Sequence, residues 1–199
     1  MIFNYEYKCK LENFTRLIKF DDIKILDFGC GKGIWSVNQV KNESKVKKIL
    51  LYDKNKILLN YLKEKYKFNK FEISSDLEEI LKKDYNVIIF SSVIQYLDPN
   101  ELRLLIGNLT HNKKKILVLI IDIPFLPRYL EFLLMPFFNI KRFIFSLSLF
   151  FSNDYKKIKY FTYKKEDFKI YENKFKINYF KNLHDLKVLR YSLLLEKID

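Results

Sequence analysis

The sequence predicts an α/β fold: a doubly wound, seven-stranded, mostly parallel sheet that ends in an antiparallel hairpin. Two observations carry this prediction. Five apolar runs of strand length alternate with helical stretches between residues 23 and 122, and such alternation favours a parallel sheet that helices cover on both faces. Two runs of alternating polarity, at 174–182 and 187–198, then follow the last predicted helix and are joined by a short turn.

The continuous apolar runs form the first five strands, because strands buried on both faces of a parallel sheet carry few polar residues. They lie at 23–29, 47–53, 70–74, 85–91 and 114–122. Segments with apolar residues at helical spacing separate them, at 34–41, 55–66, 76–83 and 98–110. Asp98 followed by Pro99 marks the start of the last of these helices.

The remaining segments flank or interrupt this alternating half. Residues 5–20 predict a short leading helix, and 162–174 predict a final helix with Thr162 as its N-cap. The stretch between Asp122 and this final helix has three prolines and many aromatic residues but no strand pattern. We expect one domain, divided into a leading helix, an alternating half, a hydrophobic helical insertion and a final helix with its hairpin, at 1–20, 21–122, 123–159 and 160–199.

The chain carries a formal net charge of +13. Clustered cations attract acidic partners, so the charge indicates nucleic acid or an anionic membrane as partner classes. The 32 lysines, five arginines and no alanine also point to AT-rich codon usage, which accounts for part of this charge. Lysine is the weaker choice for bidentate phosphate recognition, so the charge alone does not establish a nucleic-acid ligand.

Cysteine usage and hydropathy indicate the compartment. Cys9 and Cys30 make neither a disulfide framework nor a metal-ligand spacing, so we expect a reducing compartment and no metal. Residues 1–14 carry charges where a signal peptide needs an apolar core. Charged residues interrupt the apolar stretch at 116–151 before it reaches the ~18 residues of a membrane span. We expect a cytoplasmic protein and leave contact with a membrane surface open.

Three of the four glycines, Gly29, Gly31 and Gly33, lie in one turn between the first predicted strand and the next helix. A glycine-rich turn there lets backbone N–H groups and the helix N-terminus approach a ligand. The dinucleotide pattern G-x-G-x-x-G requires a glycine where this chain has Ile34. The chain instead has an acid, Asp27, two residues before G-x-G-x-G.

This segment, DFGCGKG, resembles the glycine motif of class I S-adenosylmethionine-dependent methyltransferases. Asp53 in LLYDKN matches the acid of that family that holds both ribose hydroxyls, and Asp76 in ISSDLEEI matches the acid near the adenine. The stretch YNVIIFSSVIQYLDPNEL at 85–102 resembles the segment that closes the pocket over the sulfonium. The resemblance covers about 20–122 and 160–198, and leaves 123–159 outside it.

The resemblance implies a Rossmann-like methyltransferase fold, S-adenosyl-L-methionine as cofactor and 21–122 as the cofactor-binding half. It implies as cofactor-binding residues Asp27, Gly29, Cys30, Gly31, Gly33, Asp53, Lys54, Asp76, Leu77, Ser91 and Tyr96. The chemistry agrees with these residue types, because a carboxylate binds a ribose diol through charge-assisted hydrogen bonds. Aromatic faces such as Tyr96 or Trp35 suit a sulfonium cation.

Several of these residues have an alternative, structural interpretation. Asp27 can be a cofactor ligand or a brace for the glycine turn, and Asp76 can be a ligand or a helix cap. Gln95 and Asp122 are candidate substrate contacts. Ordinary packing is the alternative for Gln95 and for Tyr96. His184, in the predicted turn of the final hairpin, is the candidate general base, with a solvated turn residue as its alternative. His111 is expected at the surface.

We expect in-line methyl transfer to a small-molecule, lipid-type or sugar-type acceptor. The place of the Asn/Asp-Pro-Pro-aromatic run of amino-group methylases is taken by Ser91, Ser92, Val93 and Ile94, and neither cysteine lies at a strand end where cytosine methylation needs a thiolate. An RNA or other nucleic-acid methyltransferase, and an inactive methyltransferase-like partner subunit, are the alternatives. The insertion either completes the core or forms an amphipathic lid at a membrane or over an apolar acceptor.

Overall fold

A computed structural model describes residues 18, 20–33, 36–37, 43–66, 70–138, 140, 143–144, 147, 159–181 and 189–198. The strands are β1 (Ile23–Phe28), β2 (Val46–Tyr52), β3 (Phe71–Ser74), β4 (Val87–Ser91), β5 (Leu117–Pro124), β6 (Phe175–Lys181) and β7 (Arg190–Lys197). The α-helices are α3 (Lys56–Lys65), α4 (Leu77–Lys82), α5 (Pro99–Thr110) and α6 (Arg128–Phe138). Two 3₁₀ helices, η2 (Ile94–Tyr96) and η4 (Lys165–Tyr171), complete the described elements.

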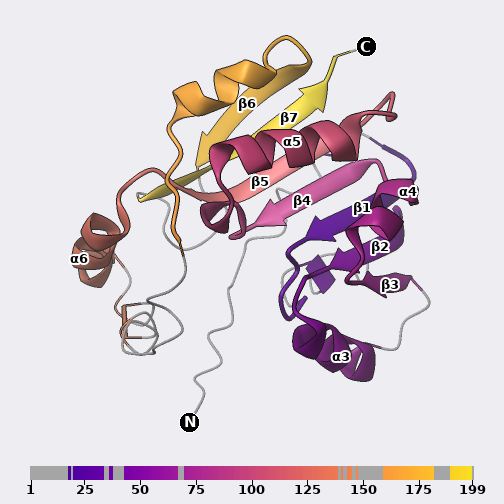
Figure 1. Ribbon diagram of the computed structural model, residues 1–199, viewed down its shortest axis with the longest axis horizontal. Helices are drawn as coiled ribbons and strands as arrows, with labels where there is room; N and C mark the ends of the chain where they lie inside the picture. Colours follow the sequence, from indigo (N-terminus) through magenta and orange to yellow (C-terminus); the bar gives the residue numbers. More distant parts are fainter. Residues whose placement is uncertain are drawn as a thin grey trace.

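The seven strands form one sheet in the order β3-β2-β1-β4-β5-β7-β6 (Figure 1). Neighbours from β3 to β5 pair in parallel. β7 pairs antiparallel with both β5 and β6, so of the seven strands it is the one that runs against the others. The predicted sheet and its antiparallel final hairpin are therefore confirmed.

Helices cover both faces of the sheet, and each face has its own apolar core. On one face, α4, α5 and η4 pack through Ile80, Ile106 and Phe168 against side chains of all the central strands. On the other, Leu59 and Leu62 of α3 pack against β1 and β2. Burial on both faces explains why the parallel strands read as nearly continuous apolar runs.

Polar residues before the helices fix where they begin. The side chain of Asn55 accepts hydrogen bonds from the first turn of α3. At α5, Asp98 and Glu101 form a reciprocal capping box ahead of Pro99. These caps satisfy N–H groups that have no partner within the helix, so the helix starts agree with the sequence.

Two predicted elements are corrected. The final helix does not start at Thr162: residues 159–164 are not helical, and the 3₁₀ helix η4 begins at Lys165, where Asp167 accepts from the Lys164 N–H. The fifth strand runs beyond Asp122 to Pro124, through a register shift between Ile120 and Ile123. The leading helix over 1–20 and the helix over 34–41 fall largely outside the described residues, although Ser36 and Val37 are helical.

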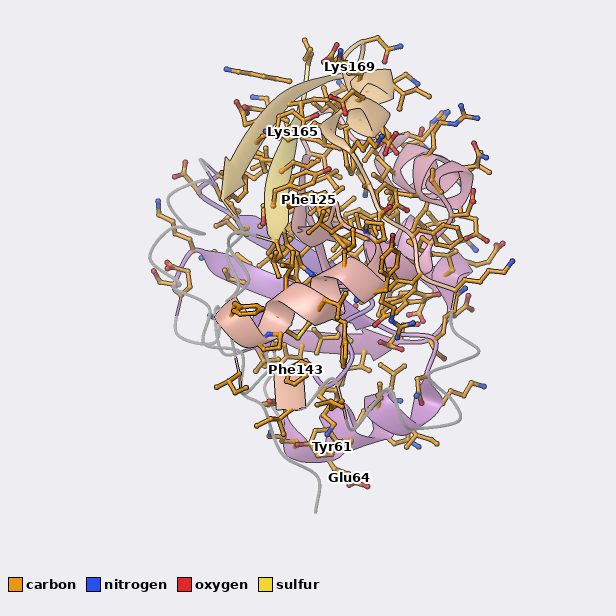
Figure 2. All side chains as sticks on the ribbon, turned by 90° about the vertical axis from the view of Figure 1, so that its left-hand side faces the viewer. Tyr61, Glu64, Phe125, Phe143, Lys165 and Lys169 are labelled. Atoms are coloured by element: carbon orange, nitrogen blue, oxygen red, sulfur yellow. The ribbon has the colours of Figure 1, made fainter. Side chains whose placement is uncertain are left out.

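The insertion contributes α6 near the carboxyl ends of the parallel strands. In Figure 1 α6 lies beyond the edge toward which β1 and β4 point, and Figure 2 shows it crossing in front of the sheet, with Phe125 above and Phe143 below. The inner side of α6 packs through Met135 against Leu189, with Leu126 and Phe143 at the margin of this small cluster. Among the described residues, every helix is too short or too polar to cross a bilayer.

Two glycine substitutions test how tightly the turn after β1 is built. Gly33 has φ +61°, and a Cβ there would lie 2.8 Å from Leu62 Cδ2. We expect Gly33→Ala to lower the free energy of unfolding by about 1–3 kcal/mol, because the alanine adopts a left-handed conformation and displaces Leu62. Urea unfolding followed by far-UV circular dichroism measures this change.

Gly107→Ala is the matched control. Gly107 lies inside α5, and a Cβ there would meet no atom within 4 Å. We expect this variant to gain about 0.5–1 kcal/mol, because alanine loses less conformational freedom in a helix than glycine. Equal effects at the two positions would contradict the conformation described for Gly33.

Candidate functional site

Strand register brings the candidate residues to one edge of the sheet. Phe28 pairs with both Tyr52 and Phe90, and Tyr52 pairs with Ser74. The residues that follow these strand ends therefore form one row at the carboxyl edge, where ligands bind in open α/β sheets. The row consists of Gly29, Asp53, Ser91 and, two residues beyond Ser74, Asp76.

The glycine turn is fastened to the end of β2. Gly29 and Cys30 both donate backbone N–H bonds to the Tyr52 carbonyl, at 2.8 and 3.0 Å. The Gly31 N–H donates to Asp53 Oδ2 at 2.8 Å. Sequence reasoning placed the turn and Asp53 at neighbouring strand ends, and the structure brings them into direct contact.

The glycines of this turn differ in their surroundings: Gly29 is closely packed, whereas Gly31 is not. Gly29 and Gly31 have φ of +71° and +55°. A Cβ on Gly29 would lie 2.4 Å from Val93 Cγ2, whereas a Cβ on Gly31 would meet no atom of the described residues within 4 Å. Gly29 is thus required by close packing, and Gly31 faces open space that a ligand can enter.

Asp27 lies beneath the turn and is almost fully buried. Its Oδ2 accepts from Ser36 Oγ at 2.5 Å, and its Oδ1 has no hydrogen-bond partner among the described residues. Burial raises the pKa of Asp27 to about 7, and the negative charge of Asp53 adds to the rise although the Ser36 bond opposes it. The Ser36 bond agrees with the brace interpretation, and the unpartnered oxygen leaves the ligand interpretation open.

The acids at the ends of β2 and β3 differ in what they already bind. Asp53 is half-buried, and besides Gly31 it accepts from the Asn55 N–H at 2.8 Å. Each of its oxygens keeps a lone pair for a further donor. Asp76 is exposed and accepts from Glu78 and Glu79 as the N-cap of α4, so the helix-cap interpretation describes it in this structure.

The other predicted cofactor contacts lie around this row. Lys54 and Tyr96 are exposed, and Leu77 and Ser91 are half-buried. Burial raises the pKa of the Cys30 thiol far above its usual range, and Asp27 and Asp53 add to the rise. Cys30 is therefore a neutral thiol that can line a pocket but cannot supply a thiolate nucleophile.

A buried polar cluster lies beyond the ends of β4 and β5, around the guanidinium of Arg190 in β7. Arg190 Nη1 donates to Gln95 Oε1 at 2.8 Å and to Asp122 Oδ2 at 2.7 Å. Its Nε and Nη2 donate to the two carboxylate oxygens of Glu131 in α6, and Nη2 also donates to Tyr160. Burial lowers the pKa of Arg190, but Asp122 and Glu131 outweigh it and hold the pKa well above its ordinary value.

The backbone at this cluster is strained. Ser92 follows β4 and Asp122 lies at the irregular part of β5, and their φ values are 55° and 67°, which costs of order 1–3 kcal/mol for a residue other than glycine. Ser92 Oγ donates to Asp122 Oδ2 at 2.7 Å. The cluster therefore stabilises a conformation of the β4 and β5 ends that the local sequence alone does not favour.

The cluster changes the expected roles of Gln95 and Asp122. The structure brings these two candidate substrate contacts together through Arg190, but both are buried and bonded within the protein. Their carboxylate and amide oxygens accept from Arg190 in this structure. Sequence reasoning missed Arg190, Glu131, Tyr160, Ser36 and Ser92. One sequence feature could have indicated the cluster: a charged residue within an apolar segment. Glu131 is the only acid between residues 123 and 153.

Two further predictions concern histidines and aromatic side chains. His111 caps the end of α5 and is exposed, as expected. The candidate base His184 and the aromatic Trp35 lie outside the described residues. Lys181 of β6 pairs with Tyr191 of β7 beside the end of β5, so the connection that contains His184 starts at the predicted carboxyl edge.

The chain was compared with known protein families and with solved structures, and the family match covers the residues described above. A family model described as "Methyltransferase small domain" matches residues 11–92, the part of the chain that holds the glycine turn, Asp53 and Asp76. No curated protein matches the chain in sequence.

Many solved structures share the fold. One is a putative type 11 methyltransferase from Sulfolobus solfataricus, with 18% identity, a TM-score of 0.60 and coverage of 94% of this chain and 91% of that one. Another is magnesium protoporphyrin IX methyltransferase from Synechocystis with bound SAH, with 14% identity, a TM-score of 0.55 and coverage of 88% and 73%. The pyocyanin biosynthetic protein PhzM shares 12% identity at a TM-score of 0.63, over 94% of this chain and 54% of that one. These likenesses establish the fold.

The raised pKa of Asp27 predicts a pH effect on stability. The carboxyl is protonated in the folded protein up to about pH 7 but ionises near its ordinary pKa of 3.8 when unfolded. Unfolding therefore releases a proton, and stability falls as pH rises from about 4 to about 7. We expect Asp27→Asn to gain stability over the wild type as the pH rises, by about 3 kcal/mol between pH 5 and pH 8, since this interval covers about two pKa units at 1.36 kcal/mol each. Urea unfolding of both proteins at pH 5 and 8 measures the difference.

Asp84→Asn is the control for this pH effect. The partner Lys24 lowers the pKa of Asp84, so this group is ionised in both states at pH 5 and above. The stability difference between Asp84→Asn and the wild type should be the same at pH 5 and pH 8. A pH-independent effect of Asp27→Asn would show that Asp27 is ionised in the folded protein.

The buried cluster predicts an order of stability losses. Arg190→Met leaves two buried carboxyl groups without their cation and should cost about 3–5 kcal/mol. Glu131→Gln keeps an acceptor for the guanidinium and leaves Asp122 paired, so about 1–3 kcal/mol is expected. Lys24→Met breaks the largely exposed pair with Asp84 and should leave the urea midpoint almost unchanged. A loss for Arg190→Met no larger than that for Lys24→Met would contradict the cluster.

Proposed function

We propose that this chain, a class I Rossmann-like methyltransferase, transfers a methyl group from S-adenosyl-L-methionine to a small-molecule acceptor, with lipid-type and sugar-type compounds as the favoured classes. The observation that carries the proposal is the contact between the glycine turn and Asp53, with open space beside Gly31. A carboxylate next to an open backbone turn is suited to a ribose diol and the chain that continues from it.

The residues present fit this cofactor. A Cβ on Gly31 would project into open space, so the glycine keeps that space free. Asp53 retains acceptor capacity on both oxygens. Asp27 has a buried oxygen without a partner among the described residues, which can receive a donor from a ligand seated over the turn. These features support a polar, nucleoside-bearing ligand rather than a merely tight turn.

The chain's own residues orient the reaction. The cofactor, when bound, supplies an electrophilic methyl group on a sulfonium centre. Asp53 holds the ribose end, and the glycine turn fixes the approach of the backbone. Tyr96, in the turn after β4, offers an aromatic face to positive charge. In-line transfer then depends on holding donor and acceptor in near-attack geometry at these strand ends. A hydroxyl or amine acceptor also loses a proton, for which His184 stays the candidate base.

The acceptor class is inferred from the acceptor side. The Gln95 and Asp122 oxygens already accept from Arg190, so these oxygens are engaged within the protein. The neighbouring surface of α6 is apolar, with Tyr129, Leu133 and Phe137 exposed. This favours an acceptor with a substantial apolar part. Magnesium protoporphyrin IX methyltransferase, named for a small-molecule substrate, has the same fold and supports the proposal by analogy.

Nucleic acid as acceptor is favoured by one observation, the net charge of +13. Phosphate contacts give a steep decrease of affinity with salt. A filter-binding titration with RNA across salt concentrations therefore separates this alternative from the proposal, which predicts no steep salt dependence and no saturable complex. The inactive-subunit alternative predicts that neither S-adenosylmethionine nor its demethylated product binds.

Cofactor binding is tested by isothermal titration calorimetry with S-adenosylmethionine and with its demethylated product. We expect both to bind the wild-type chain. Asp53→Ala should weaken binding roughly 10- to 100-fold, because it removes charge-assisted hydrogen bonds to the ribose. Gly31→Val should abolish binding by filling the space beside the turn.

Asp84→Ala is the matched control, because it removes an exposed acid that pairs with Lys24 away from the row of strand ends. Its affinity should equal that of the wild type. No binding of either ligand to the wild type would overturn the proposal and favour the inactive subunit. An unchanged affinity in Asp53→Ala would show that the ribose lies elsewhere.

A further inference from the structure

Helix α6 presents its polar and apolar sides in the reverse of the usual arrangement. Its buried residues are Glu131 and Met135, and Glu131 is turned inward to Arg190. Its exposed side chains are all large and apolar: Tyr129, Leu130, Leu133, Leu134 and Phe137. A surface helix of a globular protein normally shows the opposite distribution, with polar residues outward.

This reversal is held in place by the buried cluster. Glu131 binds the Arg190 guanidinium through both carboxylate oxygens and also accepts from Tyr160 at 2.8 Å. The Arg128 guanidinium lies 5.2 Å from the centre of the Tyr160 ring. Rotating α6 to bury its apolar side would remove Glu131 from the cluster and leave Arg190 underpaired, which is strongly unfavourable. The outward apolar side is therefore fixed by the fold.

The exposed apolar residues form a continuous surface at the carboxyl edge. Tyr129, Leu130, Leu133, Leu134 and Phe137 recur at helical spacing, and Ile140 and Ile144, which follow α6, are also exposed. In Figure 2 α6 crosses in front of the sheet between Phe125 and Phe143, and Phe125 is itself exposed. Exposed apolar patches rimmed by polar residues mark interaction sites.

Charge indicates which partner covers this surface. The sequence from Phe132 to Asn153 contains two cations, Lys141 and Arg142, and no acid. The whole chain has a net charge of +13. An anionic bilayer attracts such a chain, whereas a second copy with the same charge repels it.

We propose that α6 docks the protein on an anionic membrane surface, with the helix lying in the plane of the interface and its apolar side among the acyl chains. The occupant of the apolar surface is thus a bilayer with acidic headgroups. The proposal does not depend on methyl transfer, since it concerns only the outer side of α6. Taken with the proposed function, it places the carboxyl edge of the sheet where an amphiphilic acceptor can be collected.

The test is co-sedimentation of the full chain with vesicles of phosphatidylcholine alone and of phosphatidylcholine with roughly one-third phosphatidylserine. We expect partition into the anionic vesicles and little into the neutral ones. The double variant Leu133→Glu/Phe137→Glu should reduce partition roughly tenfold or more, because it places charge on the apolar side that enters the membrane. Both side chains are exposed, at 63% and 83%, so the fold should tolerate the change.

The matched control is Leu104→Glu/Ile57→Glu, on α5 and α3. These side chains are exposed to almost the same degree, at 63% and 79%, and the variant has the same net charge as the α6 variant. Its partition should stay close to that of the wild type. Circular dichroism of both variants verifies that they are folded, and calorimetry with S-adenosylmethionine measures the proposed function separately.

The other outcomes overturn the proposal. Equal losses of vesicle binding in the two variants would show that the chain is attracted by its net charge alone. Unchanged vesicle binding in both variants would lead to the same conclusion. No partition of the wild type would mean that the surface is covered by another part of the chain. Light scattering that shows a wild-type dimer, converted to a monomer by Leu133→Glu/Phe137→Glu, would identify a second copy as the occupant.

Discussion

The arrangement of elements at the carboxyl edge of the sheet depends on one interaction: the buried guanidinium of Arg190 must be paired with acceptors. Arg190 is almost completely excluded from water, and an unpaired cation there would be prohibitively costly. Its partners come from four separate places: η2 through Gln95, β5 through Asp122, α6 through Glu131, and Tyr160 ahead of η4. One side chain thereby determines how the insertion, the last parallel strand and the final hairpin meet.

The glycine turn after β1 depends on a different constraint: its backbone must lie close to the end of β2. The Tyr52 carbonyl accepts from two successive N–H groups of the glycine turn, and Asp53 accepts from a third. The turn is therefore built before any ligand arrives, and its geometry is set by the end of β2. Preorganisation of this kind reduces the ordering that binding would otherwise require.

Sequence reasoning found the sheet, most helix starts and the row of strand-end residues, because these follow from periodicity, capping residues and strand register. It missed the Arg190 cluster, because partners separated by 30 to 95 residues leave no local pattern. It named Gln95 and Asp122 as candidate substrate contacts, with packing as the alternative for Gln95, since a polar residue at a strand end has the same sequence pattern whether it faces a ligand or a buried cation. The final helix was misplaced because Thr162 has the identity of a cap but lies in an extended segment.

The position of Arg190 has a mechanical consequence. The guanidinium touches α6 on one side and the ends of β4 and β5 on the other, where Ser92 and Asp122 already adopt left-handed backbone conformations. The guanidinium therefore links α6 to the strand ends in addition to the short connection between β5 and α6. Because the guanidinium is rigid and planar, it holds α6 in a fixed position relative to the ends of β4 and β5, so a displacement of the helix is transmitted to the strained backbone at Ser92 and Asp122.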